Sequence, residues 1–431
     1  MRINRLRTSQ TCFIKLVMFC GLFCLSLFPA YTQDYSGRTE DLTIKIIIIS
    51  PGDEIYMWWG HIVLIVEDTR ENRLRLFEWG TFTYPGNSFI LDFINGQIRY
   101  FCTSMPLDME RFINGNWEIR AYSLNLDRNA KEIILNYAEN NVLPENCYYD
   151  YRLFSDNCST RIRDIIDMGT GGQFKAAFDG VPGQYSLRQH IRRYTWFKPV
   201  SDWFLCLLMG HNFDKKISPW EAMFLPVEVA RNIGNITYFD SSGMERKLVD
   251  SVQVFDSSKK IPAIVDKPPL SWPFSLLAGV LAAVLLLFID VFNKKRYRNA
   301  RILLALIQSL LGLILGLTGC VLVFSIFFMN GEYFHMNSNL LFVNPLFLAI
   351  IPLVILSGIK KTHMNIFGKL LRMFWTYVFV AGIITAFLCV LPFFYQQNQG
   401  TLGFILPIAF ALSYMPEKTS KLLALHVKHG I

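Results

Sequence analysis

The sequence predicts an α+β exported domain followed by an all-α membrane bundle of five helices. Three observations support this fold class. The chain has 431 residues, of which 52% are hydrophobic and only 18% charged, whereas roughly 25% are charged in a typical soluble domain. Long apolar stretches begin after Pro269. Before that point, strand and helix patterns occur without βαβ regularity, which favours an α+β domain.

Residues 1–30 have the pattern of a secretory signal. Basic residues at Arg2, Arg5 and Arg7 precede an apolar run that extends to Pro29. The cleavage signal is poor, because Phe28 is too large for its position. We therefore expect residues 1–30 to be a signal peptide or an N-terminal anchor, and residues 31–265 to form the exported domain.

Residues 266–431 are expected to form the membrane domain. Its five apolar stretches are residues 271–292, 302–329, 340–359, 373–394 and 401–415. A spanning helix needs about 20 apolar residues, and the fifth stretch, which is the shortest, also contains Pro407. Twelve Lys and Arg residues lie in alternate connections and the tail, and none lies in the other two connections. This bias places the basic connections in the cytoplasm and the exported domain on the opposite side.

The net charge of +8 divides unevenly between these parts. Residues 31–270 contain 26 Lys and Arg and 31 Asp and Glu, a net charge of −5, whereas the remainder contains 16 and 3, a net charge of +13. The positive charge follows the membrane topology, so a nucleic-acid partner is not expected.

The exported domain shows both strand and helix signals. Strands are expected at residues 45–50, 61–67, 73–79 and 117–126, and helices at 127–141 and 218–232. The first strand is a continuous β-branched run, and the next two form a hairpin with its loop at 68–72. The second helix opens with Ser218, Pro219 and Glu221, which suit its N-cap, its first turn and a capping box.

Cys158 is the candidate nucleophile. It follows the helix-capping residue types Asp156 and Asn157 and precedes isoleucines at 162, 165 and 166. This spacing predicts Cys158 in the first turn of a helix, where unpaired N–H groups and the helix dipole favour a thiolate. The alternative is a buried structural cysteine or a disulfide; the other exported cysteines are Cys102, Cys147 and Cys206.

A cysteine nucleophile needs a base, and His61 is the best candidate because it begins an apolar strand after Gly60. If the hairpin loop centres near Arg70, position 61 lies across from position 78 or 79. Glu78 would then hydrogen-bond the imidazole and orient it. A slip of one residue would turn Glu78 to the other face. A structural histidine and a solvated glutamate are the alternatives.

Polar residues also lie at a predicted membrane boundary. His335, Asn339 and Asn344 are expected on the same side as Cys158, where they either shape a lipid-facing site or cap helices. His190 and its arginine neighbours are expected to form a basic surface patch. The sequence contains no HExxH, CxxC, Walker or GxGxxG pattern, so no metal or cofactor is expected.

Three motifs carry a resemblance to a known family: Trp59-Gly60-His61, Gly80-Thr81-Phe82 and Asp156-Asn157-Cys158-Ser159-Thr160-x-x-Arg163-Asp164. Together with the membrane region, they resemble a lipoprotein N-acyltransferase family with an N-terminal periplasmic domain and five membrane helices. The order of histidine before cysteine also resembles circularly permuted, papain-like NlpC/P60 folds. The resemblance implies Cys158 as nucleophile and His61 as base, whereas Glu78 rests on hairpin geometry alone.

The family resemblance implies acyl transfer in the bacterial inner membrane. Cys158 would take an acyl chain from a membrane phospholipid as a thioester and pass it to the α-amine of a diacylglyceryl-cysteine lipoprotein. His61 would move the protons. Groups around Asn157 and Ser159 would support the oxyanion.

Two other functions are open. A membrane-anchored cysteine amidase or peptidase acting on cell-wall peptide would use the same side chains, but it needs one anchor and not five helices. A non-enzymatic envelope sensor or assembly protein would leave Cys158 structural, but the predicted cytoplasmic connections are short for an output domain.

Overall fold

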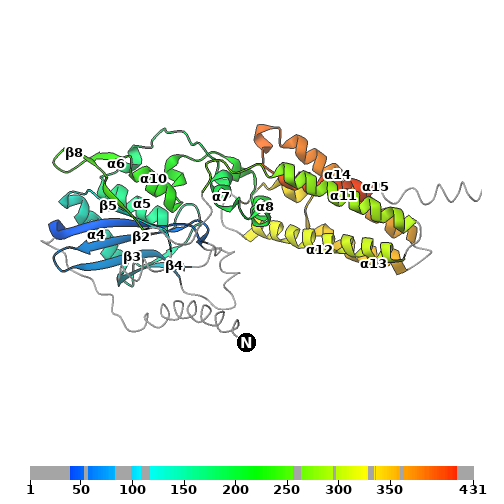
Figure 1. The fold of residues 1–431 in the computed structure, drawn as a ribbon, viewed down its shortest axis with the longest axis horizontal. Helices are drawn as coiled ribbons and strands as arrows, with labels where there is room; N and C mark the ends of the chain where they lie inside the picture. Colours follow the sequence, from blue (N-terminus) through cyan, green and yellow to red (C-terminus); the bar gives the residue numbers. More distant parts are fainter. Residues whose placement is uncertain are drawn as a thin grey trace, which may run out of the picture.

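The computed structural model describes residues 39–52, 57–82, 99–107, 117–255, 264–294, 298–328, 334, 336–359 and 364–414. The predicted signal segment and His335 lie outside the described residues. The described chain has a sheet-containing part at one end of its long axis and a helical part at the other (Figure 1).

A seven-stranded antiparallel sheet forms the centre of the first part, in the order β6-β4-β3-β2-β1-β5-β9. Its strands are β1 (Leu42–Ile49), β2 (His61–Asp68), β3 (Arg73–Phe82), β4 (Arg99–Pro106), β5 (Ile119–Leu124), β6 (Tyr148–Asp150) and β9 (Val249–Phe255). The four predicted strands and the hairpin between β2 and β3 are confirmed. β3 runs three residues further than predicted, past an irregularity between Glu78 and Thr81.

Helices cover one face of this sheet (Figure 1). They are α4 (Arg128–Asn141), α5 (Cys158–Gly169) and α10 (Pro226–Ile233). The core between the layers contains Ile44 and Ile62 from the sheet and Ile162 from α5, all fully buried. Ile47 and Ile65 are buried on the opposite face. β1 is thus covered on both faces, as its continuous run of isoleucines indicates.

The helix predicted over residues 218–232 is in fact two short helices, α9 (Pro219–Ala222) and α10. Ser218 and Glu221 form the predicted capping box at the start of α9. Pro226 has no N–H group and cannot sit in a helix interior without breaking the hydrogen-bond ladder. The chain therefore ends one helix and begins the next with Pro226 in its first turn.

Smaller elements complete the exported part. They are η1 (Thr39–Asp41), α6 (Gln173–Ala176), α7 (Leu187–Thr195), α8 (Pro199–Leu208), η4 (His211–Asp214), and the hairpin of β7 (Thr237–Phe239) and β8 (Glu245–Lys247). α7 and α8 lie between the sheet and the long helices (Figure 1). They connect the two parts of the molecule.

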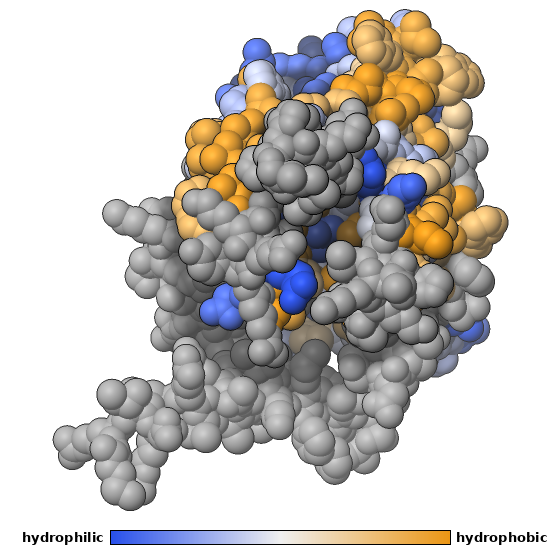
Figure 2. Space-filling model, turned by 90° about the vertical axis from the view of Figure 1, so that its right-hand side faces the viewer, coloured by the Kyte–Doolittle hydropathy of each residue, from blue (hydrophilic) through white to orange (hydrophobic). Residues whose placement is uncertain are grey.

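The second part is helical. Its elements are α11 (Trp272–Lys294), α12 (Arg298–Phe328), η5 (Ser338–Leu341), η6 (Pro345–Ala349), α13 (Ile350–Ile359), α14 (Met364–Leu388), η7 (Pro392–Phe394) and α15 (Gln399–Tyr414). Four segments of the described chain are long and apolar enough to cross a membrane: Trp272–Phe292, Asn299–Phe327, Ser338–Leu356 and Ile366–Leu388. Hydrophobic side chains form large areas of the described surface of this part when it is viewed end-on (Figure 2). The fifth predicted stretch forms α15, whose 16 residues extend only about 24 Å.

The third candidate span is irregular, because it consists of η5, η6 and α13 instead of one continuous helix. Backbone of this kind is tolerated at membrane depth only where protein surrounds it. Phe342, Val343 and Phe347 are fully buried. α12 approaches closely through Gly319, where an added Cβ would lie 2.2 Å from the carbonyl carbon of Asn344.

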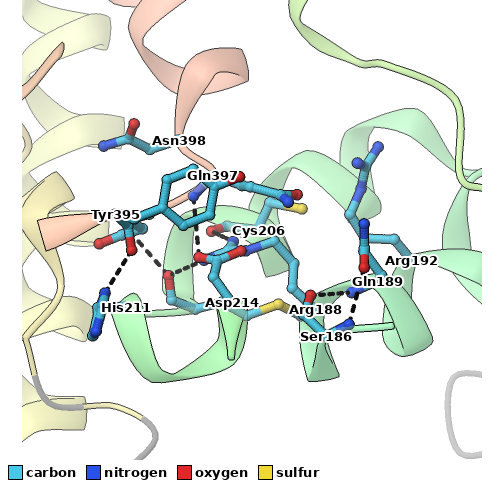
Figure 3. Close-up of polar contacts among 12 residues, drawn as sticks. Ser186, Arg188, Gln189, Arg192, Cys206, His211, Asp214, Tyr395, Gln397 and Asn398 are labelled. Atoms are coloured by element: carbon cyan, nitrogen blue, oxygen red, sulfur yellow. Dashed lines mark hydrogen bonds and ion pairs between the residues drawn. The ribbon is translucent and has the colours of Figure 1, made fainter. Parts of the chain in front are cut away.

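The expected basic surface patch on α7 is wrong. Arg188 and Arg193 are fully buried, and Arg192 is 7% exposed. Arg188 pairs with Asp214 at an N–O distance of 2.8 Å. Arg192 pairs with Asp202 at 3.0 Å, and Arg193 pairs with Glu228 at 2.7 Å. Burial lowers the pKa of the adjacent His190 to about 4. The basic run is therefore buried and paired, and Figure 3 shows Arg188 and Arg192 of this run at the junction with the helical part.

Candidate active site

Cys158 is the first residue of α5. The side chain of Asn157 accepts hydrogen bonds from the N–H groups of Ser159 and Thr160, both at 2.9 Å. The Thr160 hydroxyl in turn accepts from the Asn157 N–H. The amide of Asn157 also donates to the carbonyls of Leu153 and Phe224. The predicted position of Cys158 is confirmed, and the cap fixes the residue at which α5 begins.

The structure brings together the three side chains that the sequence singled out. The Sγ atom of Cys158 lies 3.6 Å from Nδ1 of His61. Nε2 of His61 lies 2.9 Å from Oε1 of Glu78. The side chains of His61 and Glu78 are 19% and 27% exposed, so the site is close to solvent. This is the order in which a nucleophile, a base and an orienting carboxylate are arranged.

Glu78 reaches His61 diagonally and not from directly across the hairpin. β2 and β3 pair Leu64 with Phe77, and three further steps of this register place Gly80 opposite His61. Glu78 is two positions from Gly80 and therefore on the same face. A Cβ at Gly80 would lie 2.6 Å from Cε1 of His61. Because Gly80 has no side chain, the imidazole of His61 can occupy this space.

The charges of the site favour an imidazolium. Burial alone would lower the pKa of His61, but the charge and hydrogen bond of Cys158, together with those of Glu78, raise it well above its usual value. For Glu78, burial alone would raise the pKa of the carboxyl. The hydrogen bond and charge of His61 outweigh this effect and lower that pKa. The arrangement therefore suits an imidazolium between the sulfur of Cys158 and the carboxylate of Glu78.

Two tyrosines beside this trio were not predicted. The rings of Tyr100 and Tyr151 stack with their centroids 4.1 Å apart. Burial, followed by the negative charge of Cys158, raises the pKa of Tyr100 to about 12 and that of Tyr151 well above its usual value. Both phenols therefore stay protonated beside Cys158. The available signal for Tyr151 was its spacing from Tyr149: Tyr149 lies in the short strand β6 and Tyr151 just after it, shortly before the cysteine helix.

The backbone at the start of α5 has one N–H group that no described residue uses. Among the described residues, none accepts a hydrogen bond from the N–H of Cys158. The N–H of Ser159 is used by Asn157, and the Ser159 hydroxyl is buried without a partner among the described residues. The direct roles predicted for Asn157 and Ser159 at an oxyanion stay predictions; what the structure gives them is helix capping and burial.

The polar residues that the sequence predicted at a membrane boundary, Asn339 and Asn344, belong to the helical part and not to the Cys158 site. Asn339 is fully buried, and its amide donates to the carbonyl of Leu207 in α8 at 2.9 Å. Asn344 caps η6 and donates to the hydroxyl of Tyr377. A lipid-facing role for these two asparagines stays a prediction, as does that of His335.

The other cysteines among the described residues are Cys102, Cys147, Cys206, Cys320 and Cys389, and like Cys158 all of them are free thiols. Among the described residues, no group of three or more His, Cys, Asp or Glu side chains is placed to hold a metal ion.

One comparison with known proteins gives a match. A family model described as the Lnb N-terminal periplasmic domain matches residues 28–193, which is less than half of the chain. No curated protein and no solved structure matches. The matched stretch contains Cys158, His61 and Glu78. This similarity and the four candidate spans support a multi-pass membrane protein with a periplasmic segment that carries the candidate site.

Proposed function

We propose that this protein is a lipoprotein N-acyltransferase of the bacterial inner membrane. It moves a fatty acyl chain from a phospholipid, through a thioester on Cys158, to the N-terminal α-amine of a diacylglyceryl-cysteine lipoprotein. The carrying observation is the Cys158–His61–Glu78 arrangement, with its 3.6 Å and 2.9 Å contacts. The apolar helices attached to it support a substrate held in lipid, since one anchor would suffice for a water-soluble peptide.

The first half-reaction transfers the acyl chain to the enzyme. The thiolate of Cys158 attacks the ester carbonyl carbon, and negative charge develops on the carbonyl oxygen. In this proposal, the N–H of Cys158 at the start of α5 stabilises that charge. The carbon–oxygen bond to glycerol then breaks. The imidazolium of His61 protonates the leaving oxygen, which gives a lysophospholipid and an acyl thioester.

The second half-reaction releases the product. The α-amine of the lipoprotein attacks the thioester carbonyl, and neutral His61 accepts a proton from the nitrogen. The carbon–sulfur bond breaks and restores the thiolate, so the imidazolium–thiolate pair is regenerated. Glu78 holds the imidazole in the orientation that both steps need. A thioester intermediate avoids direct attack of an amine on an unactivated ester.

The test is to trap the acyl-enzyme. The full-length protein in detergent is incubated with phospholipid carrying a labelled acyl chain, without lipoprotein. Label should appear on the Cys158 peptide and be released by neutral hydroxylamine. Cys158→Ala should abolish labelling, and Cys158→Ser should give at most an oxygen ester that resists this treatment. Cys147→Ala, which alters another partly exposed cysteine, should label normally.

The functional readout is mass spectrometry of lipoprotein N-termini in cells that rely on this protein alone. Cys158→Ala should lower N-acylation by at least roughly 10³-fold. Unchanged N-acylation would rule out Cys158 as nucleophile. Cleavage of a cell-wall peptide without acyl labelling would support the cysteine peptidase alternative, which the same three side chains would serve.

A further inference from the structure

A cavity of about 590 Å³ lies where the exported part meets the helical part. Arg188 and Arg192 of α7 and Trp203 of α8 line one side, and Trp272 of α11 and Gln399 of α15 line the other. Pockets that bind small molecules have volumes of roughly 300–1,000 Å³ and are common at domain interfaces. The cavity is therefore large enough for the head group of a lipid.

The lining of the cavity favours an anion. It includes Arg188, Arg192 and Lys267, but none of its described lining residues is Asp or Glu. Arg188 already donates its hydrogen bonds to Asp214 and to three backbone carbonyls, so it is not the main group that would bind an anion. Arg192 uses Nε for Asp202 and Nη2 for the carbonyl of Pro269. Its Nη1 donates to none of the described residues, although the side chain is more than nine-tenths buried.

Two further features point to the same ligand charge. Lys267 is exposed and has no carboxylate partner among the described residues. The first turns of α11 and α15, at Trp272 and Gln399, both contribute to the lining. Both helices therefore present the positive ends of their dipoles. An oxyanion such as a phosphate monoanion would meet Arg192, Lys267 and these two helix starts together.

The position of the cavity points to a lipid. Trp272 begins the first candidate span, and Trp203, Trp272 and Tyr395 all line the cavity. Trp and Tyr are enriched at the level of lipid head groups. Figure 3 shows Tyr395 and Gln397 facing the α7 and η4 side chains across this junction. A phosphate bound here would have lipid chains within reach along the exposed apolar faces of α11.

We propose that this cavity binds the phosphate head group of a membrane phospholipid. The further step, that this lipid is the acyl donor, rests on the proposed function. Of the two proposed substrates, the phospholipid carries a phosphate and the diacylglyceryl-cysteine of the lipoprotein does not. α7 supports this link: Arg188 and Arg192 face the cavity, while Leu187 and Ile191 pack in a cluster with Trp59 and Phe154. These two aromatic residues lie two and four positions from His61 and Cys158.

The experiment counts bound lipid by native mass spectrometry of the full-length protein in detergent. The probes are phosphatidylglycerol, phosphatidylethanolamine and diacylglycerol with the same acyl chains. Both phospholipids should bind more tightly than diacylglycerol. Lys267→Gln and Gln399→Glu should each weaken phospholipid binding by about five- to tenfold. Gln399→Glu adds a carboxylate at a helix N-terminus, where it favours the fold, while it repels a phosphate.

The controls separate the possible outcomes. Lys215→Gln alters an exposed lysine outside the lining and should bind phospholipid normally. Equal binding of diacylglycerol, or unchanged binding by Gln399→Glu, would overturn the proposal. If inorganic phosphate binds and added lipid does not change its binding, free phosphate is the ligand. That result would also overturn the proposal. Normal lipid binding by a protein without acyl-transfer activity would refute the proposed function only.

Discussion

His61 lies between two groups that stabilise its protonated form. Nδ1 faces the sulfur of Cys158, and Nε2 faces the carboxylate of Glu78. Each contact raises the pKa of the imidazole, against the opposite effect of burial. The consequence is an imidazolium that persists at a higher pH than a free histidine would allow. In the proposed reaction, this imidazolium is the acid that protonates the leaving glycerol oxygen at neutral pH.

Glu78→Gln should shift the pH dependence of acyl transfer. The hydrogen bond and charge of Glu78 both raise the pKa of His61, so their loss lowers it. A raised pKa keeps His61 protonated until the pH passes that value; in Glu78→Gln the imidazolium is lost at lower pH. The high-pH limb of the kcat/KM profile should move to lower pH, and the maximum should fall at least roughly tenfold.

The readout for this variant is the rate of acyl transfer together with alkylation of the Cys158 peptide as a function of pH. Glu67→Gln is the matched control, because Glu67 lies on the same hairpin and pairs with Lys45 instead. Identical pH profiles for Glu78→Gln and the unaltered protein would show that Glu78 does not act on His61.

Single residues were predicted well where local rules apply and poorly where burial decides. The capping types before Cys158 indicated its place in the first helical turn, because capping is a local interaction. The fate of Arg188 and Arg193 depends on carboxylates that lie 26 and 35 positions further along the chain. No local pattern distinguishes such buried, paired arginines from a basic surface patch.

At the scale of elements, the β2–β3 hairpin delivers two of the three site residues. Its loop, its strands and the shared face of His61 and Glu78 follow from alternation and turn position, so they could be predicted. The expected partner position, 78 or 79, differs from Gly80, the position to which the β2–β3 register extends, because the loop midpoint determines the register only to within a residue or two. The contact with Glu78 survives because residues two apart on a strand share a face.

Gly80→Ala should disturb the site without unfolding the sheet. The backbone at Gly80 is not left-handed, so alanine can adopt it. The new Cβ would, however, lie 2.6 Å from the imidazole of His61, and the ring must move away from Glu78 or Cys158. We expect acyl transfer to fall about 10–100-fold, with a thermal midpoint close to that of the unaltered protein.

The control for this variant is Gly234→Ala, where the added Cβ would meet its nearest atom at an ordinary 3.6 Å. It should retain full activity. If Gly80→Ala were as active as Gly234→Ala, the space at position 80 would have no role in placing His61.

At the scale of the whole molecule, a buried polar junction joins the exported part to the helices. Asn337 donates to the carbonyls of Leu207 and Leu208. The N–H of Gln397 donates to Asp214, and the carbonyl of Tyr395 contacts the ring of His211 (Figure 3). Charge asymmetry predicted on which side of the membrane these loops lie. It could not predict that they dock on α8, because such contacts join residues nearly 200 positions apart.

Gln396 is central to this junction and provides its test. The side chain is fully buried; its amide donates to Met209 and Asn337, and its oxygen accepts from the N–H and hydroxyl of Ser338. Gln396→Ala leaves these groups buried without their partner, at roughly 1–3 kcal/mol for each unsatisfied group. Hydrogen exchange should then accelerate at the amides of α8 and in the first turn of α15, but not in α4 or α5, which belong to the separate sheet core.

Gln308→Ala is the matched control, since Gln308 is also buried but bonds Trp375 within the helical part. It should destabilise that part and leave exchange in α8 unchanged. Acceleration in α8 by Gln396→Ala alone would show that this junction holds the exported part against the helices. Equal exchange in both variants would contradict it, because a junction that depends on Gln396 must respond to the loss of that side chain.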